Sequence, residues 1–92
     1  MIKVFAHRGA SGTYPENTKS AILAAVDLAV DGIEIDVQSC LDDYMIIHDT
    51  WLDRTTSGRG KVNACSKAQI QQFDAGNGEI VPTLQQAIDW VN

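Results

Sequence analysis

The sequence predicts an α/β fold, and three features of the 92-residue chain support this prediction. The segments 2–6, 32–38 and 44–48 have the length and the content of β-branched and aromatic residues typical of strands. The segment between the first two runs has helical periodicity, which favours a strand–helix–strand unit with a right-handed crossover. Two further helices are expected near the C-terminus, because capping motifs precede them.

The first helix is expected to begin after a polar loop that follows the first strand. Asn17 or Thr18 can cap its amino end, directly after a proline that suits an early helical position. Over residues 18–30 the apolar positions recur at intervals of three and four, which places them on one helical face. These positions are Ile22, Ala25, Val26, Ala29 and Val30. Gly32 is expected to end the helix in the left-handed conformation.

Residues 32–38 alternate strictly between apolar and polar side chains, so they are predicted to form one strand with two different faces. The apolar face carries Ile33, Ile35 and Val37, and the polar face carries Glu34, Asp36 and Gln38. The polar link to the run at 44–48 is too short for a crossover helix. We therefore expect an antiparallel hairpin that brings His48 back towards Asp36.

Residues 49–63 are expected to be loop, and the capping box S/T-x-x-E/Q then occurs at 66–69 and at 83–86. The second of these helices places Leu84, Ala87, Ile88 and Val91 on one face. Three strands are too few to close a barrel, so open strand edges are expected. The chain is therefore interpreted either as a fragment or as a unit whose edges another chain covers.

Composition argues against several classes of partner. Twelve acidic and seven basic residues give a formal charge of −5 without a basic patch, which disfavours nucleic acid and anionic membranes. No apolar run approaches the roughly 18 residues of a membrane span, so no stable membrane insertion is expected. The N-terminus enters a strand-like run at once, which leaves no room for a signal peptide. Cys40 and Cys65 are interpreted as free thiols of a cytoplasmic protein, with a disulfide as the alternative.

Two acidic residues of the predicted strand could hold a metal ion. Glu34 and Asp36 lie two positions apart, roughly 6–7 Å at Cα, with their carboxylates on one face. Two like charges facing one site raise each other's pKa unless a cation lies between them. Oxygen ligands favour Mg²⁺ or Ca²⁺ over zinc. A strand with one solvated face would show the same alternation, so spacing alone leaves both interpretations open.

His7 and His48 each follow an apolar strand, where a single histidine is more often a structural residue. Arg8 and Gly9 come directly after the first histidine, and Asp49, which could be a solvated loop acid, follows the second. Taken together the set is more specific. Two imidazoles can act as base and acid near neutral pH, an arginine can bind a phosphoryl group through two nitrogens, and glycine lets backbone amides approach an anion. Phosphodiester hydrolysis requires these functions.

Six segments resemble, in the same order, the signatures of the glycerophosphodiester phosphodiesterases. They read HRG at 7–9, PENT at 15–18, GIEIDV at 32–37, IHD at 47–49, LDRTTSGRG at 52–60 and VPTL at 81–84. The resemblance spans nearly the whole chain. It implies a (β/α)₈ TIM barrel of about 250 residues with its active site at the carboxyl ends of the strands. Residues 1–92 are then the N-terminal, incomplete part of that barrel.

The resemblance also implies the roles of the site residues. Glu34 and Asp36 ligate a divalent metal, Mg²⁺ or Ca²⁺, and Arg8 binds the substrate phosphate. His7 and His48 form the acid–base pair. By analogy with the phosphoinositide phospholipases C, a substrate hydroxyl attacks phosphorus to give a cyclic phosphate, with His7 as the base and His48 as the acid. The substrate is a small glycerophosphodiester, and the products are glycerol 3-phosphate and an alcohol such as choline or ethanolamine.

Two departures from the family pattern accompany the resemblance. The third metal carboxylate and a nearby lysine belong to later strands that this chain lacks, and residues 39–43 read SCLDD where the family has a Leu-Thr-x-Asp-Gly turn. A non-catalytic truncated module that pairs through its strand edges is therefore an alternative. A phospholipase or sphingomyelinase D of a neighbouring family is a third interpretation, which segment 15–18 disfavours. The isolated 92 residues are expected to be inactive and marginally stable.

Overall fold

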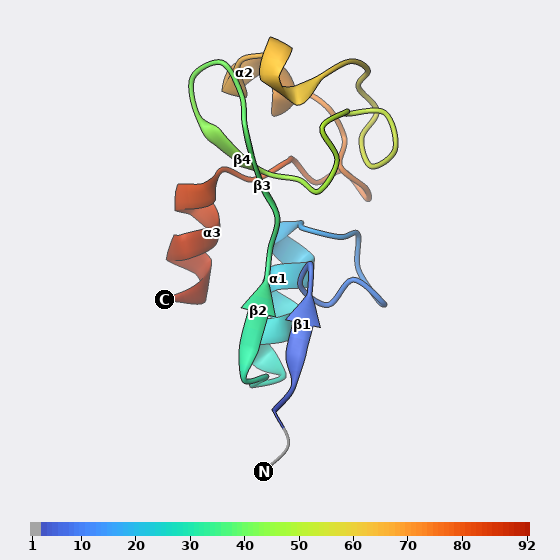
Figure 1. Cartoon of the computed structure of the whole chain (residues 1–92). Coiled ribbons are helices and arrows are strands. Elements are labelled where there is room, and N and C mark those ends of the chain that lie inside the picture. The colour runs from blue at the N-terminus through green and yellow to red at the C-terminus, as the bar shows by residue number, and fades with distance from the viewer. Residues whose placement is uncertain (1–2) are drawn as a thin grey trace.

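The computed structural model describes residues 3–92, which form an elongated molecule of 43 × 22 × 18 Å. Its elements are β1 (Phe5–His7), α1 (Lys19–Asp27), β2 (Gly32–Glu34), β3 (Val37–Ser39), β4 (Tyr44–Ile46), the 3₁₀ helix η1 (Val62–Ala64), α2 (Lys67–Ile70) and α3 (Leu84–Val91). In Figure 1 β1, β2 and α1 occupy one end of the molecule, and the β3–β4 hairpin lies with α2 at the other. Helix α3 packs beside α1 and β4.

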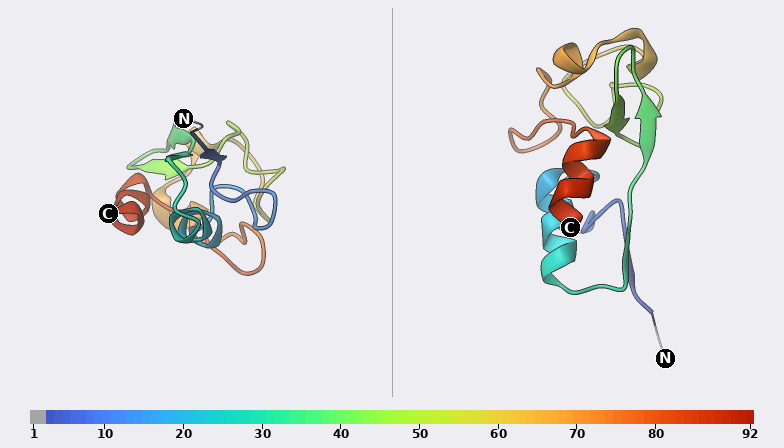
Figure 2. Two further views of the ribbon diagram at one scale, coloured as in Figure 1. Left: turned by 90° about the horizontal axis from the view of Figure 1, so that it is seen from below. Right: turned by 90° about the vertical axis from the view of Figure 1, so that its left-hand side faces the viewer.

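The strand–helix–strand unit is present as predicted. Strands β1 and β2 are parallel neighbours, with His7 opposite Glu34 at their carboxyl ends. Helix α1 connects them and lies on one face of the pair, as the right-hand view of Figure 2 shows. The first strand begins later than the predicted 2–6, and Ile2 lies outside the described residues.

The end of α1 differs from the prediction. Ala29, at φ 53°, adopts the left-handed conformation that was expected at Gly32. Gly32 is needed for space instead, because a Cβ there would lie 2.4 Å from the Phe5 ring. The capping residue of α1 is Thr18, whose side chain accepts a hydrogen bond from the amide of Ala21. Of the two candidate caps, the structure therefore selects Thr18.

The segment 32–38, predicted as one strand, is divided between two sheets. Strand β2 ends at Glu34, and β3 begins at Val37 and pairs with β4 in the expected antiparallel hairpin. At Asp36 the backbone N–H donates to the side chain of Asn17 instead of to a neighbouring strand. The alternation of apolar and polar residues continues through this break, so the sequence pattern does not reveal where β2 ends. Within residues 3–92 the parallel sheet therefore has two strands, and the third predicted strand belongs to the separate hairpin.

Two apolar clusters hold the molecule together. The larger lies under the hairpin and comprises Met45, Ile47, Leu52, Val62, Ile70, Ala75 and Val81. The smaller joins Ile22 of α1, Ile46 of β4 and Ala87 of α3. Because β4 contributes to both clusters, it ties the hairpin to the strand–helix–strand unit. The backbone of Ile46 also donates to Pro82 O at 2.8 Å, just before α3 begins.

Both capping boxes form as predicted, at the start of α2 and at the start of α3. The apolar face of α3, in contrast, is only partly covered. Ile33, Ile35, Ile88 and Val91 line an open groove of about 250 Å³ together with Ala87 and Asn92. Over residues 3–92 there is no helix with the length and hydropathy needed to cross a membrane.

Candidate active site

The carboxyl ends of the two parallel strands bring His7 and Glu34 together. These residues lie opposite each other in the β1–β2 register, and His7 Nε2 is 3.0 Å from Glu34 Oε1. Both side chains are more than half exposed, at 61% and 58%. An imidazole paired with a carboxylate on an open surface can take up or release a proton within reach of a ligand.

Arg8 follows in a tight turn directly after β1. Its φ is 58° and that of Gly9 is 73°, so two successive residues are left-handed. Gly9 is required here, because a Cβ would lie 2.7 Å from the backbone of Ala21 in α1. The Arg8 side chain is four-fifths buried, and its Nη1 donates to Glu16 Oε2 at 3.0 Å.

One nitrogen of Arg8 lacks a hydrogen-bond partner. Nε is buried and lies 3.5 Å from Asp36 Oδ2, without the geometry of a hydrogen bond. A buried donor left without an acceptor costs about 1–3 kcal/mol. Arg8 Nε therefore interacts with Asp36 through charge, at ion-pair distance, and not through a hydrogen bond.

Asn17 holds Asp36 in place. The Asn17 side chain is 3% exposed, donates from Nδ2 to Asp36 Oδ2 at 3.1 Å and accepts from Asp36 N at 3.3 Å. Its own backbone N–H donates to Arg8 O at 2.9 Å. Asn17 thus connects the turn after β1 with the link between β2 and β3. Sequence reasoning assigned it only a possible capping role.

His48 belongs to a second group of charged residues after β4. Its Nδ1 lies 2.7 Å from Asp49 Oδ1. Arg54 donates two hydrogen bonds to Asp49, from Nε at 2.8 Å and from Nη2 at 3.0 Å. It donates two more to Glu16, from Nη1 at 2.9 Å and from Nη2 at 3.0 Å. Glu16 in turn accepts from Arg8. Charged contacts therefore run without a break from His48 to the turn after β1.

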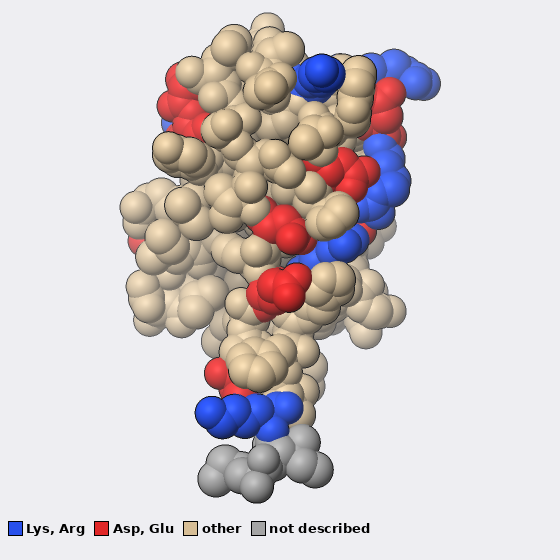
Figure 3. Space-filling view, in the orientation of Figure 1, with Lys and Arg blue, Asp and Glu red and all other residues tan. Residues whose placement is uncertain are grey.

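The charge state of this group follows from its contacts. Hydrogen bonds from Arg54, then from His48, hold the pKa of Asp49 far below its usual range. Arg54 and then Arg8 also lower the pKa of Glu16. The two carboxylates in turn raise the pKa of Arg54. Both acids are thus anionic at neutral pH, and Figure 3 shows acidic and basic side chains side by side on this face.

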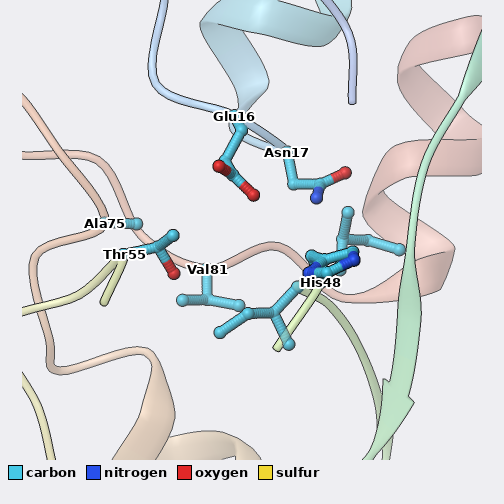
Figure 4. Close-up of a pocket in the computed structure, with 8 residues that line it drawn as sticks. Glu16, Asn17, His48, Thr55, Ala75 and Val81 are labelled. Atoms are coloured by element: carbon cyan, nitrogen blue, oxygen red, sulfur yellow. The ribbon is translucent and has the colours of Figure 1, made fainter. Parts of the chain in front are cut away.

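A small cavity lies between the two groups. Figure 4 shows Glu16 and Asn17 on one side of it and His48 and Val81 on the other. Its volume is about 10 Å³, which is about the space of one water molecule. A ligand larger than a water molecule therefore does not fit inside it.

The five predicted site residues thus fall into two direct pairs and one linked residue. His7 contacts Glu34, and Arg8 lies beside Asp36. Across residues 3–92, His48 forms no hydrogen bond or ion pair with the other four predicted residues through its side chain; Asp49, Arg54 and Glu16 connect it to Arg8. Sequence reasoning gave no role to Glu16 or Arg54, although both stand in the matched segments 15–18 and 52–60.

The predicted metal ligands provide suitable donors but not a full shell. Carboxylate oxygens suit Mg²⁺ and Ca²⁺, and Mg²⁺ is often held by one or two carboxylates with waters completing the shell. Glu34 and Asp36 carry such oxygens, and each carboxylate has its own contacts, Glu34 with His7 and Asp36 with Asn17. Among residues 3–92, no group of three or more potential metal-ligating side chains converges. The chemistry of the two donors therefore suits a hard cation, but these residues do not form a full shell.

Comparison with known proteins decides the family. The model of the glycerophosphoryl diester phosphodiesterase family matches residues 7–92. The chain belongs to this family. The match begins at His7 and includes all five predicted site residues, which confirms the resemblance inferred from the six segments.

Curated relatives and solved structures agree with this assignment. A glycerophosphodiester phosphodiesterase of Caldanaerobacter subterraneus is 42% identical over 96 residues, which cover 96% of this chain and 40% of the relative. Human glycerophosphodiester phosphodiesterase 1 is 35% identical over 97 residues, which cover 95% of this chain and 29% of the relative.

Two solved structures establish the fold. A phosphodiesterase of Oleispira antarctica in complex with the product sn-glycerol-3-phosphate superposes with a TM-score of 0.93 at 36% identity, over 99% of this chain and 40% of that one. A glycerophosphodiester phosphodiesterase of Agrobacterium tumefaciens gives 0.90 at 39% identity, over 97% and 42%. The chain thus spans about 40% of the length of these two solved proteins. The predicted fold, the N-terminal part of a TIM barrel, is confirmed.

Proposed function

We propose that the protein carrying this chain is a metal-dependent glycerophosphodiester phosphodiesterase that releases glycerol 3-phosphate and an alcohol. Residues 1–92 supply the N-terminal part of its barrel domain. The observation that supports this proposal is the convergence of His7 with Glu34 and of Arg8 with Asp36 at the carboxyl ends of β1 and β2. That edge is where TIM-barrel enzymes carry their active sites. The product complex of the Oleispira relative agrees with this substrate class.

The chain's own residues divide the chemistry between them. Arg8, whose side chain is one-fifth exposed, binds a phosphate oxygen through its guanidinium. When His7 donates its Nε2 proton to Glu34, Nδ1 keeps a lone pair that can remove the proton of the attacking hydroxyl. That oxygen bonds to phosphorus as the bond to the alcohol breaks, and His48 delivers a proton to the departing alkoxide. The resulting cyclic phosphate is opened by water in a second step, which gives glycerol 3-phosphate.

Glu34 and Asp36 are the residues that would hold Mg²⁺ or Ca²⁺. When bound, the cation supplies positive charge that stabilises the anionic transition state of phosphoryl transfer. Asn17 keeps the Asp36 carboxylate in one orientation towards that position. Ordered carboxylates lose less conformational freedom on binding a cation.

Assays of the whole protein with glycerophosphocholine and glycerophosphoethanolamine test the proposal. We expect glycerol 3-phosphate to appear with Mg²⁺ or Ca²⁺ present, and EDTA or Glu34→Ala to abolish it. Failure to release glycerol 3-phosphate from either compound, with metal supplied, would overturn the proposed activity. Activity that withstands both EDTA and Glu34→Ala would overturn the metal role alone.

A second candidate function rests on the open apolar groove between β2 and α3. The groove, lined by Ile33, Ile88 and Val91 among others, favours a module that associates through this face. The 92 residues alone are proposed to be inactive, because their metal shell is partial. A folded oligomer of this chain without phosphodiesterase activity, encoded by a gene that stops after Asn92, would favour this candidate. The cytoplasmic location and the lack of nucleic-acid binding stay predictions.

A further inference from the structure

We propose that Arg54 is a positioning residue that fixes the His48 imidazole through Asp49, a role that rests on the proposed function. Arg54 lies outside the residues given a chemical role above. It stands in the loop after β4 and reaches back to Glu16, which is 38 positions earlier in the chain. Its guanidinium therefore joins the two parts of the site.

Arg54 uses nearly all of its hydrogen-bond donors. Four of its five N–H groups have carboxylate partners: two face Asp49 and two face Glu16, at 2.8–3.0 Å. Each carboxylate is thus bound through two parallel hydrogen bonds, which fixes direction as well as distance. An isolated exposed ion pair contributes little to stability. Two bidentate pairs on one guanidinium determine the orientation of Asp49.

Asp49 in turn orients the His48 imidazole through a hydrogen bond. Its Oδ1 lies 2.7 Å from His48 Nδ1 and also accepts from Arg54 Nη2. A carboxylate at Nδ1 keeps a proton on that nitrogen, so the proton that the imidazolium gives to the alkoxide is the one on Nε2. The other end of the arrangement is firmly held, because Glu16 is four-fifths buried and also accepts from Arg8. A shift of Arg54 would therefore change the direction of Nε2.

The same loop provides a matched control. Arg59 lies five positions further along, is 88% exposed, and has its nearest carboxylate, that of Asp53, 3.8 Å away. Arg59→Gln removes the same charge from the same loop without touching His48. Arg54→Gln and Arg59→Gln therefore separate a positioning effect from a general loss of positive charge.

The experiment compares two substrates of the whole enzyme that differ only in their leaving group. Glycerophosphocholine releases an alkoxide that needs a proton, whereas the p-nitrophenyl diester of glycerol phosphate releases a stable anion that needs none. Arg54→Gln is expected to lower kcat for glycerophosphocholine by about 10- to 100-fold, with a much smaller loss on the p-nitrophenyl ester. Arg54→Lys should have a kcat between those of Arg54→Gln and wild type, because an ammonium cannot bind two carboxylates bidentately. Arg59→Gln should change neither rate.

Equal losses on both substrates, or full recovery by Arg54→Lys, would overturn the positioning role. Nitrogen NMR of the His48 ring provides a readout that does not depend on activity. In the neutral ring, wild type should hold one tautomer, protonated at Nδ1, and Arg54→Gln should populate both. If wild type hydrolyses neither substrate, the proposed function fails, and the NMR comparison still decides the positioning role. An unchanged His48 spectrum in Arg54→Gln would refute it.

Discussion

The Asn17 side chain forms two hydrogen bonds with Asp36: Nδ2 donates to the carboxylate at 3.1 Å, and Oδ1 accepts from the backbone N–H at 3.3 Å. This contact joins residues 19 positions apart, and it falls where the chain leaves the parallel sheet for the hairpin. The strand expected over 32–38 breaks at this point, where the Asp36 N–H donates to the Asn17 side chain and the Asp36 carbonyl accepts from Ile47 N. Asn17 therefore orients a proposed metal ligand and binds the backbone where the chain changes sheets.

Removal of the Asn17 side chain should weaken metal binding. Asn17 has φ 58°, so Asn17→Gly keeps the backbone conformation accessible while it deletes both contacts. We expect the affinity for Mg²⁺ or Ca²⁺ to fall about 10-fold or more, as for other groups that orient a metal ligand. Isothermal titration calorimetry on the whole protein measures this affinity.

Asn77 is the matched control for this substitution. It has φ 53°, is exposed, and lies in the loop before α3. Asn77→Gly removes the same side chain from the same backbone conformation, and should leave the metal affinity within about twofold of wild type, because distant surface changes rarely couple to a site. Equal weakening in both variants would argue against a role for the Asn17 side chain.

Gly9→Ala should destabilise the protein. A Cβ at position 9 would meet the backbone of Ala21 at 2.7 Å, and a φ of 73° is unfavourable for alanine. We expect a loss of about 1–3 kcal/mol in the free energy of unfolding. Urea denaturation measures it. Gly12→Ala, where the added atom meets nothing within 4 Å, should stay close to wild type; a similar loss there would show that the turn after β1 is not specially constrained.

Patterns along the sequence predicted the local elements because those elements depend on nearby residues. The capping boxes at 66–69 and 83–86, the hairpin and the crossover helix all have their determinants within a few positions. The parallel arrangement of β1 and β2 was also accessible, since a right-handed crossover helix joins parallel strands. Such elements need little tertiary information.

The features that sequence reasoning missed depend on contacts between distant segments. The strand break at Asp36 requires Asn17, and the roles of Glu16 and Arg54 require two loops 38 positions apart to meet. Periodicity carries no record of such partners. The end of α1 shows the same limit. The left-handed conformation was expected at Gly32 but occurs at Ala29, and Gly32 is required because a side chain there would clash with Phe5.

Thr83→Ala should cost more stability than Ser66→Ala, although both residues open capping boxes. Thr83 is 6% exposed and the hydrogen bonds of its capping box are partly buried, whereas those of Ser66 are exposed. An exposed cap typically contributes about 1 kcal/mol, and values reach about 2 kcal/mol. We expect Thr83→Ala to approach the upper value. Thermal unfolding of both variants checks the order, and a larger loss for Ser66→Ala would contradict it.

Acid should destabilise the protein partly through Asp49. Its folded pKa is depressed by Arg54 and His48, so ionised Asp49 stabilises the folded state above the unfolded pKa of about 3.9. This contribution is lost as the pH falls from about 3.9 through the lower folded value, because the folded state releases the proton more readily than the unfolded state. Glu16, whose pKa is also lowered by Arg54, adds to the effect in the same direction.

Asp49→Asn removes the titrating group and therefore isolates its share of the acid sensitivity. The variant should be less stable than wild type at pH 7, since the hydrogen bonds of Arg54 to a carboxylate become bonds to an amide. The gap should narrow as the pH falls below about 3.9, where wild type loses the same charge. Urea denaturation at a series of pH values measures both curves. Parallel curves would mean that the Arg54–Asp49 contact contributes nothing to the pH dependence of stability, and that the depressed pKa of Asp49 does not hold in solution.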